Sequence, residues 1–559
     1  MARLSGINLR NFKAVGDAPV HLALAPVTLL YGPNGAGKSS ILHALHYTRE
    51  VLERGNLDPD RTLAGGSLDL GGWRALVHQR DVERDMVLGF ELETFELGGF
   101  LSMDGFDFAI DSGRLMLPDH IEQIAVELTM RWSHLLRRPY VGRLAINLMG
   151  QRFAVVEATP DLKNVDLVEL DLDHPVLNEG GHSDNDPERG IDAVLFAGKP
   201  ACQVGLLGWA GALPPLDRPL HLDLEAHPHD LSHERSDTET RGYREPPFSR
   251  SDTAQPRADL REQEALSDYL DALIVGPLRQ LRDALAAMVA IGPLRELPPR
   301  GFQPQRSPDP TRWTSGLAAW DRLTELDEET VAEVDAWMSG DTRLGSGFGV
   351  RVERFRHVTT ASPFAELMGR GLTPLDVADL ARLWDEIPQE RRITLRDVAR
   401  RMDVEPAEIG IGVSQLLPVV VAALDYSARF VAVEQPELHV HPRLQTGLGD
   451  LFAFGVAPVG EQLALFGDMP PMAISNGRTF LIETHSEHLA LRLLRRIREA
   501  NEGEADPDAP TVTPAMLSIN YALPGEAGLT LLRLRVDETG EFLDRWPEGF
   551  FAERRAELF

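Results

Sequence analysis

The chain has 559 residues, of which 43% are hydrophobic and 25% are charged, a composition typical of globular domains. Its formal net charge of −30 at pH 7 argues against a broad nucleic-acid surface, because phosphate backbones are bound by clustered cations. The one cysteine, Cys202, excludes internal disulfides, and the apolar runs are too short for a membrane span or a signal core. We therefore expect a cytoplasmic protein with no membrane partner.

The first part of the chain predicts short strands, a glycine-rich loop and a helix. Apolar runs within residues 3–31 predict two or three strands, and SSILHALHYTREVLER after the loop predicts a helix. The loop is GPNGAGKS, from Gly32 to Ser39, which fits G-x-x-x-x-G-K-[S/T] in the strand–loop–helix context of a P-loop. In such a loop Lys38 reaches the β- and γ-phosphates of ATP and Ser39 binds Mg²⁺. The residues expected to bind the nucleotide are Asn34, Gly35, Ala36, Gly37, Lys38, Ser39 and Ser40.

The middle of the chain has three parts that differ in residue pattern. Alternation of apolar and polar residues from about Met86 to Leu172 predicts antiparallel strands. Residues 179–260 contain loop-like stretches rich in Pro, His, Asp and Ser, and helical periodicity dominates from Leu260 to about Arg401. Within and just beyond that helical part, Arg392 to Ile409 has the rhythm of a DNA-reading helix-turn-helix. A second helix there would run into the glycines that follow, so we expect a packing helix instead.

The stretch FVAVEQPELHVHP, from Phe430 to Pro442, predicts a buried strand that ends at an acid. Glu434 at the end of this strand would hold Mg²⁺ beside the P-loop. The next residue is Gln435, which can orient a water molecule but has no carboxylate to accept its proton. The candidates for the missing base are Glu437, His439 and His441.

A third apolar strand lies in TFLIETHSEHL, from Thr479 to Leu489, and is followed by a helix. Strands of an open α/β sheet direct their carboxyl ends toward the ligand crevice. We therefore expect His485, at the end of this strand, to face the nucleotide.

Together the P-loop, the acidic strand and the strand ending in THS resemble the ABC-type ATPase heads of the RecF, SMC and OLD-like group, within the AAA-family ATPases. The resemblance covers roughly residues 1–90 and 400–500. It implies an α/β P-loop NTPase head assembled from both chain ends, with a β-rich lobe and a helical insertion between them. It also implies that His485 senses the γ-phosphate. The expected segments are 1–90 (first half of the head), 91–260 (β-rich lobe with a polar loop insertion), 261–400 (helical insertion), 401–500 (second half of the head) and 501–559 (short C-terminal domain).

The resemblance implies further nucleotide contacts near the N-terminus. In this family, basic or aromatic residues surround the adenine, and Arg10, Phe12 and Lys13 of INLRNFK are the matching candidates. Gln79 in WRALVHQRD is the candidate for the Q-loop residue that binds the metal, with Gln151 as its rival.

The family also has a signature loop that completes the nucleotide site across an ATP-sandwiched dimer. GIGVSQLLPVVVAAL, from Gly410 to Leu424, lies just before the acidic strand, where that loop belongs. Ser414 would donate to the γ-phosphate held by the partner. Gln415 and Leu416 depart from the common motif, which has glycines at these positions.

The sequence therefore predicts an ATP- and Mg²⁺-dependent ATPase that turns over slowly and forms a homodimer, or a higher oligomer, around ATP. VEQPELHVHP, GVSQLLP, GPLRELPPRGF and FLDRWPEGFF resemble a prokaryotic stand-alone subgroup with a short C-terminal domain. Related heads occur in bacterial genome-defence operons, which implies an anti-phage switch that controls a separately encoded effector, either a nuclease or a toxin. The short remainder after His485 predicts no nuclease domain in this chain.

Two alternatives stay open. The first is a RecF-like repair ATPase that clamps DNA, for which Arg492, Arg495, Arg496 and Arg498 would supply cations. The second is a scaffold that binds ATP for assembly and does not hydrolyse it.

Overall fold

The structure is a computed structural model, and it describes residues 2–93, 121–171, 173–178, 204–223, 267–305, 309–371, 377–457, 477–504, 506 and 508–547. The chain divides into two compact units. Unit 1 comprises Met1–His21, Val51–Asp60 and Gly71–Ala284, and unit 2 comprises Leu22–Glu50, Arg61–Leu70 and Leu285–Phe559. Within the described ranges, no helix is long and apolar enough to cross a membrane.

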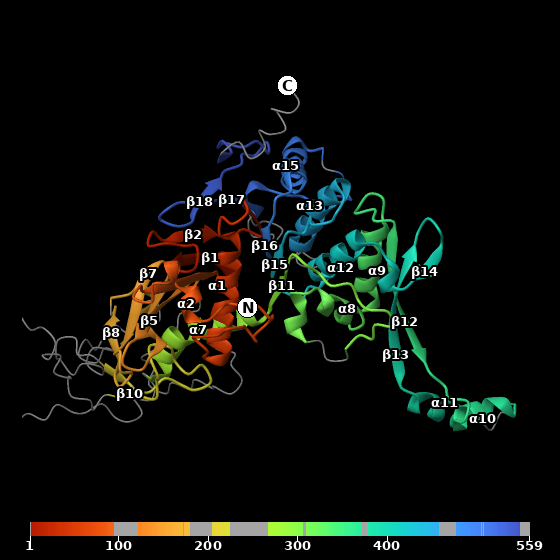
Figure 1. Cartoon of the computed structure of the whole chain (residues 1–559), viewed down its shortest axis with the longest axis horizontal. Helices are drawn as coiled ribbons and strands as arrows, with labels where there is room; N and C mark the ends of the chain where they lie inside the picture. Colours follow the sequence, from red (N-terminus) through yellow and green to blue (C-terminus); the bar gives the residue numbers. More distant parts are fainter. Residues whose placement is uncertain are drawn as a thin grey trace, which may run out of the picture. The chain divides into compact units, whose positions relative to one another are not determined.

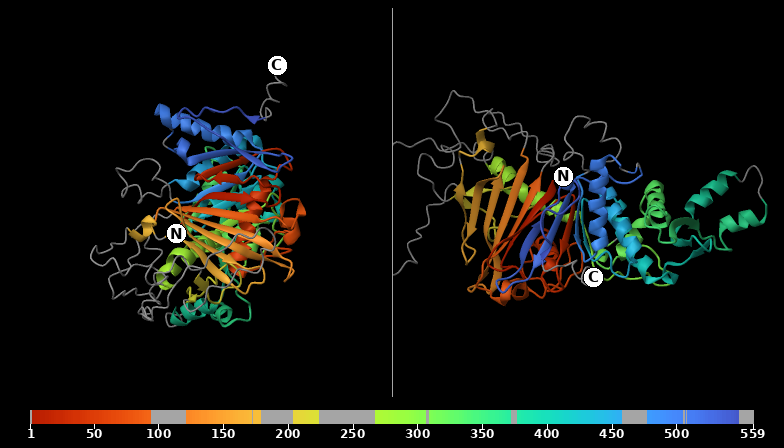
Figure 2. Two further views of the ribbon diagram at one scale, coloured as in Figure 1. Left: turned by 90° about the vertical axis from the view of Figure 1, so that its left-hand side faces the viewer. Right: turned by 90° about the horizontal axis from the view of Figure 1, so that it is seen from above.

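Unit 1 is built on an antiparallel sheet whose strands lie side by side in both views of Figure 2. The strand order is β10–β9–β8–β7–β6–β5–β4–β1–β2, and the residues of β2 divide between the two units. The strands are β1 (Arg3–Arg10), β2 (Val20–Ala23), β4 (Met86–Glu93), β5 (Gln123–Ser133), β6 (Arg138–Leu148), β7 (Gln151–Ala158), β8 (Val165–Leu170), β9 (Val204–Leu206) and β10 (Leu222–Asp223). The prediction of antiparallel strands beginning near Met86 is confirmed by the pairing of β4 through β8.

Among the described residues of unit 1, the helical elements are short except for α7. They are α2 (Trp73–Leu76), the 3₁₀ turn η1 (His78–Arg80), α4 (Pro175–Asn178), the π-helical turn η2 (Asp271–Val275) and α7 (Gly276–Ala286), whose last residues belong to unit 2. Arg279 of α7 holds the preceding π-helical turn through its ion pair with Asp271.

Unit 2 contains a central sheet of strands from distant parts of the chain (Figure 1). Its order is β11–β15–β16–β3–β17–β18, with parallel pairing up to β17 and an antiparallel last pair. The strands are β3 (Val27–Tyr31), β11 (Met288–Ile291), β15 (Phe430–Glu434), β16 (Thr479–Glu483), β17 (Leu517–Leu523) and β18 (Thr530–Leu534). Every residue of β3 and β16 is buried, as expected for parallel strands covered on both faces. Because β3 lies between β16 and β17, the prediction of an α/β head assembled from both chain ends is confirmed.

Helices pack on the sheet of unit 2, and those that follow β11 in the chain share one apolar core with it. They include α1 (Lys38–Arg54), which starts in unit 2, and α8 (Leu317–Leu323), α9 (Glu328–Ser339), α12 (Ile411–Leu424), α13 (Pro442–Val456) and α15 (Glu487–Glu502). Short 3₁₀ turns are η3 (Pro310–Trp313), η5 (Pro406–Glu408) and η7 (Pro514–Met516). Trp320, Leu417, Phe452 and Phe480 are among the buried residues of this core.

The inserted segment before α12 contains a small sheet as well as helices. The sheet order is β12–β13–β14, formed by β12 (Phe348–Arg356), β13 (Gln389–Asp397) and β14 (Met402–Val404). Helices α10 (Pro363–Gly369) and α11 (Val377–Glu386) lie between β12 and β13 in the chain (Figure 1). The expected packing helix over Arg392–Ile409 is wrong: its first part, through Asp397, belongs to β13, which pairs with β12 and β14 and places Ile393, Leu395 and Asp397 on one face. The five-segment division of the chain stays a prediction.

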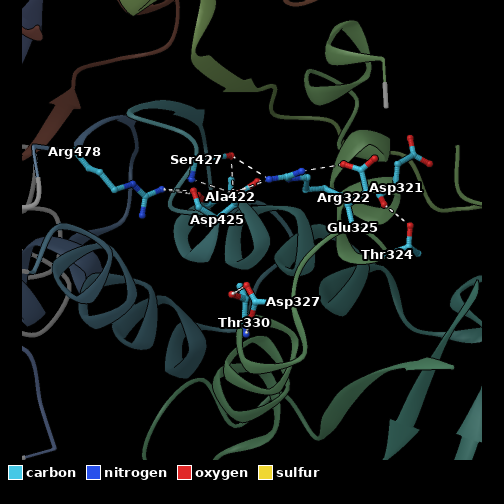
Figure 3. Close-up of polar contacts among 10 residues, drawn as sticks. All are labelled: Asp321, Arg322, Thr324, Glu325, Asp327, Thr330, Ala422, Asp425, Ser427 and Arg478. Carbon is cyan, nitrogen blue, oxygen red and sulfur yellow. Dashed lines mark hydrogen bonds and ion pairs between the residues drawn. The ribbon is translucent and has the colours of Figure 1, made fainter. Parts of the chain in front are cut away.

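Buried polar contacts fix the end of α12, as Figure 3 shows. The guanidinium of Arg478 donates to the carbonyl oxygens of Ala422, Ala423 and Asp425, which end this helix. Asp425 in turn accepts from Arg322 of α8, with 2.6 Å between Oδ2 and Nε. Carbonyls at the end of a helix lack intrahelical donors, and here the side chain of Arg478, directly before β16, supplies them.

Candidate functional site

The P-loop lies between β3 and α1 and curls over the side chain of Lys38. Nζ of Lys38 donates to the carbonyl oxygens of Gly32, at 3.0 Å, and Pro33, at 3.1 Å. Gly32 has φ of 143°, and a Cβ there would lie 2.5 Å from the carbonyl oxygen of Ala522, so a larger residue does not fit. The loop tip at Asn34 is exposed. The start of α1, at Lys38, is suited to a phosphate because the N-terminus of a helix carries a partial positive charge.

Two carboxylates from neighbouring strands lie beside the P-loop. Glu434 ends β15, Glu483 ends β16, and the two are partners in the parallel register. Ser39 Oγ donates to Glu483 Oε2 at 3.0 Å, and Lys38 Nζ lies 3.7 Å from Glu483 Oε1. Glu434 was predicted from the sequence and Glu483 was not. The same signal is present in the sequence for both residues: an apolar strand that ends at an acid.

Burial and neighbouring charges shift the pKa values of Glu434, Glu483 and Lys38. Burial, and next the negative charge of Glu483, raise the pKa of Glu434 to about 7. Burial likewise raises the pKa of Glu483, although the ammonium group of Lys38 opposes this shift. The Ser39 hydroxyl favours the ionised form of both acids, but it has one proton to donate, and the hydrogen bond goes to Glu483. Burial lowers the pKa of Lys38, opposed by Glu483.

The donor set of this site fits Mg²⁺ together with a nucleotide. Hard oxygen donors come from the hydroxyl of Ser39 and from two carboxylates whose pKa values are raised by burial and next by neighbouring negative charge. Among the described residues, no group of three His, Cys, Asp or Glu side chains is placed to hold a metal ion. Mg²⁺ in nucleotide sites commonly takes one or two carboxylates and completes its shell with phosphates and water, which Ser39 and these two carboxylates would allow.

The residues after Glu434 connect the acidic strand to the turn that carries His485. Gln435 has φ of 46°, and its N–H donates to the carbonyl oxygen of Glu483 at 2.7 Å. Glu437 accepts from Thr484 Oγ1 at 2.8 Å and from the His485 N–H at 2.7 Å. Both carboxylate oxygens of Glu437 are therefore engaged in shaping the turn. Burial, and next the charge of Lys38, lower the pKa of His485, so its imidazole is neutral at pH 7.

The candidate signature loop places glycine and isoleucine, and not serine, at the surface. Gly410 is the N-cap of α12, and Ile411 is 60% exposed. Ser414 is fully buried, and its hydroxyl donates to the carbonyl oxygen of Ile411 at 2.8 Å. A Cβ at Gly412 would lie 2.9 Å from the carbonyl oxygen of His439, so this glycine permits close packing against the segment after β15.

Arg295, in the segment after β11, is the second site residue that the sequence did not reveal. It is 4% exposed, and its Nη2 donates to the carbonyl oxygens of Glu434, at 2.8 Å, and Gln435, at 3.2 Å. The surrounding GPLRELPPRGF was noted for its family resemblance, but no local pattern distinguishes this arginine from the many others in the chain.

Four of the other predicted nucleotide contacts belong to unit 1, and their roles stay predictions. Arg10 is exposed and pairs with Asp17 at 2.7 Å, whereas the ring of Phe12 is fully buried. Lys13 donates its backbone N–H to Leu76. Gln79 is exposed, with φ of 56°, and accepts from Arg84 at 3.3 Å.

The rival candidate for the Q-loop residue and two candidates for the missing catalytic base lie as follows. Gln151 is the exposed first residue of β7, also in unit 1. His439 and His441 of unit 2 are exposed, and Nδ1 of His441 accepts from the Arg443 N–H at the start of α13. As placed here, the ring of His441 therefore serves as a helix cap.

The arginines that would serve a DNA clamp are paired with acids of unit 2. The pairs are Arg492–Asp450 at 3.2 Å, Arg495–Glu499 at 2.6 Å, Arg496–Asp450 at 2.7 Å and Arg498–Glu541 at 2.8 Å. Asp450 lies on α13 and the arginines on α15, so two of these pairs join the helices. Three acids thus offset most of the positive charge of the four arginines, which weakens the case for a phosphate-binding patch here.

Comparison with known proteins identifies the P-loop segment. Residues 6–48 match the model of a family described as an AAA domain, a range that includes the whole P-loop. This confirms the resemblance to AAA-type ATPases over that segment, whereas membership of a prokaryotic stand-alone subgroup stays a prediction. No curated protein matches the sequence.

Among solved structures, the chain is similar to several SMC head domains at low TM-score. The SMC head domain from Thermotoga maritima is 10% identical with a TM-score of 0.33, and the match covers 96% of this chain and 100% of that one. An Smc head domain with an extended coiled coil, bound to the C-terminal domain of ScpA and derived from Pyrococcus furiosus, is 12% identical with a TM-score of 0.33, covering 96% and 97%. An SmcHead bound to the C-winged helix domain of ScpA is 11% identical with a TM-score of 0.34, covering 96% and 98%.

Proposed function

We propose that the chain binds ATP with Mg²⁺ at the P-loop of unit 2 and hydrolyses it slowly. One observation carries this proposal: Lys38 and Ser39 of the P-loop contact Glu483, whose partner in the register of the neighbouring strand is Glu434, in one largely buried cluster. A phosphate-binding loop beside acids at strand ends is the arrangement that phosphoryl transfer requires.

Each residue of the cluster has a task in this reaction. Lys38, which now bonds to loop carbonyls, would turn to the β- and γ-phosphates. Ser39, Glu434 and Glu483 would hold Mg²⁺, which when bound supplies positive charge against the phosphates. Gln435 would orient the attacking water without accepting its proton, which predicts slow turnover.

Glu437 and His485 act together in this proposal. Both oxygens of Glu437 accept hydrogen bonds from the turn that carries His485, so Glu437 serves better as a holder of this turn than as a general base. The neutral imidazole of His485 would then meet the γ-phosphate as a hydrogen-bond donor.

The proposal extends to a nucleotide-dependent dimer. Ile411 and Gly412 at the start of α12 are at least partly exposed, and the free N–H groups of this helix end would meet the γ-phosphate held by a second copy. For Ser414 to take part, its hydroxyl must leave the carbonyl of Ile411. Closure of such a dimer around ATP would make the protein a switch that controls a separate effector, nuclease or toxin, in anti-phage defence. The defence role rests on the family resemblance of the motifs around Glu434 and Arg295.

A nucleotide titration tests the binding step. Fluorescent ATP with Mg²⁺ should bind Lys38→Ala roughly tenfold or more weakly than wild type, because the variant lacks the cation for the phosphates. Lys163→Ala is the matched control, since Lys163 has 79% of its side chain exposed in unit 1 and should leave the affinity unchanged. Equal affinity of Lys38→Ala and wild type would contradict the site.

The scaffold alternative keeps one observation in its favour. Gln435 stands where a catalytic acid is expected, and an ATP-binding site with no efficient base could serve assembly alone. Binding measurements do not separate the scaffold from the hydrolase, whereas turnover does.

A further inference from the structure

Arg295 lies buried between α12 and the end of β15. Its Nη1 donates to the carbonyl oxygen of Gln415 on α12 at 3.1 Å. Its Nη2 donates to the carbonyl oxygens of Glu434 and Gln435. One guanidinium therefore joins the backbone of the candidate signature helix to the two residues at the centre of the proposed reaction.

Gln415 returns the contact from α12. Its Oε1 accepts from the backbone N–H of Arg295 at 3.2 Å, and its Nε2 donates to the backbone carbonyl of Arg295. Gln415 is 3% exposed, so water does not replace these bonds. A glycine at this position, as in the common form of the motif, would make neither bond. Gln415, which departs from the common motif, thus has a specific partner in the fold, Arg295.

The charge and the shape of Arg295 suit this position. Burial lowers the pKa of Arg295 to about 10, opposed by Glu437 and Glu434, so the guanidinium stays protonated at neutral pH. Charge-assisted hydrogen bonds are stronger than neutral ones, and the planar fork of arginine bonds several carbonyls at fixed angles. A lysine ammonium has the charge without that fixed geometry.

Gln435 needs such support because its backbone is strained. A φ of 46° is uncommon and unfavourable for a residue with a Cβ. The Gln435 N–H is held by Glu483, and its carbonyl is held by Arg295. These two bonds fix the backbone from which the Gln435 side chain projects.

We propose that Arg295 and Gln415 are positioning residues that couple the start of α12 to Glu434 and Gln435. Through this pair, engagement of α12 by a second copy would set the backbone that orients the attacking water. The inference deepens the proposed ATP hydrolysis and rests on it. Arg295 acts through Gln435 and does not itself touch the nucleotide.

Single-turnover hydrolysis and ATP affinity of the full chain test the pair. Arg295→Lys and Gln415→Met should each slow hydrolysis roughly tenfold or more, because a misplaced water-orienting group costs rate and not binding. ATP affinity should stay within about threefold of wild type, since neither residue belongs to the P-loop. Arg478→Lys is the matched control: it changes another buried arginine that bonds to backbone carbonyls of α12, and it should lower thermal stability without slowing hydrolysis below its melting temperature.

A double-mutant cycle separates positioning from a general packing defect. If Arg295 acts through Gln435, adding Arg295→Lys to Gln435→Ala should slow hydrolysis by less than about twofold further. Full multiplication of the two single effects would overturn the inference, and so would an unchanged rate in both Arg295→Lys and Gln415→Met.

Failure of the inference and failure of the proposed function are distinguishable. A wild-type rate above that of Lys38→Ala, with the Arg295 and Gln415 variants as fast as wild type, overturns the inference alone. A wild-type rate no higher than that of Lys38→Ala overturns hydrolysis and the inference with it.

Discussion

Glu434 and Glu483 show how the residues of a binding site can lower the stability of the folded protein. Two carboxylates lie at the ends of adjacent strands, Glu483 buried and Glu434 half-buried, and the ammonium group of Lys38 lies 3.7 Å from Glu483. Their raised pKa values mean that the empty folded state resists their ionisation. A cation bound with phosphates would relieve this repulsion, which ties the stability of the site to its ligand.

Glu434→Gln should reveal this cost as a pH-dependent gain in stability. The pKa of Glu434 is near 4.5 in the unfolded chain and about 7 in the folded one, so the folded state holds the extra proton between these values. Stability of the wild type therefore falls as pH rises from about 4.5 to 7, by roughly 3 kcal/mol. The variant, which carries no charge at any pH, should be about that much more stable than wild type at pH 8 and nearly equal at pH 4.

Urea unfolding without nucleotide and Mg²⁺, at pH 4, 5 and 8, measures this effect. Glu526→Gln changes an exposed loop acid and should show no comparable pH dependence. The account of Glu434 is contradicted if its variant differs from wild type by the same amount at pH 4 and pH 8.

At the scale of elements, the side chain of Arg478 binds the carboxyl ends of two helices directly before a strand. Arg478 precedes β16 and donates to the last carbonyls of α12 and to the carbonyl of Gly455 on α13. It is 1% exposed, and its guanidinium lies 5.1 Å from the Tyr426 ring centroid and 5.2 Å from that of Phe480. The carboxyl ends of α12 and α13 are therefore anchored at the start of β16.

Arg478→Met should therefore destabilise unit 2 strongly. The variant keeps an apolar stem but leaves several buried carbonyls without donors, which costs about 3–5 kcal/mol. Chemical denaturation monitored by circular dichroism checks the value. Arg429→Met, which changes an exposed arginine directly before β15, should change stability by less than about 0.5 kcal/mol. A loss below about 1 kcal/mol in Arg478→Met would mean that water satisfies these carbonyls.

At the scale of the whole molecule, the site exists because distant segments of the chain meet. β3 lies between β16 and β17, and Trp546 packs its ring edge-on against Tyr31, directly before the P-loop, with 5.2 Å between centroids. The hydroxyl of Tyr31 donates to the carbonyl of Ser486, next to His485, at 2.8 Å. The N-terminal P-loop thus rests on the C-terminal part of the chain.

This long-range construction decides what the sequence could predict. The P-loop and the strand ending at Glu434 carry local signals, so both were predicted before their neighbours were known. Arg295 matters only because of residues more than a hundred positions away, and its local sequence gives no sign of them. β13 was mistaken for a helix because charged residues obscure the alternation of Ile393 and Leu395, which only pairing with β12 makes decisive.

The central claim, slow hydrolysis at a site that uses Gln435, is tested most directly by single-turnover ATP hydrolysis. Wild type, Lys38→Ala and Gln435→Glu would be compared under excess protein, with Mg²⁺. The account predicts a slow wild-type rate that clearly exceeds that of Lys38→Ala, and a Gln435→Glu rate equal to or faster than wild type, since the variant adds a carboxylate where water is oriented. A wild-type rate no higher than that of Lys38→Ala, with hydrolysis created only by Gln435→Glu, would contradict the account and identify an ATP-dependent scaffold.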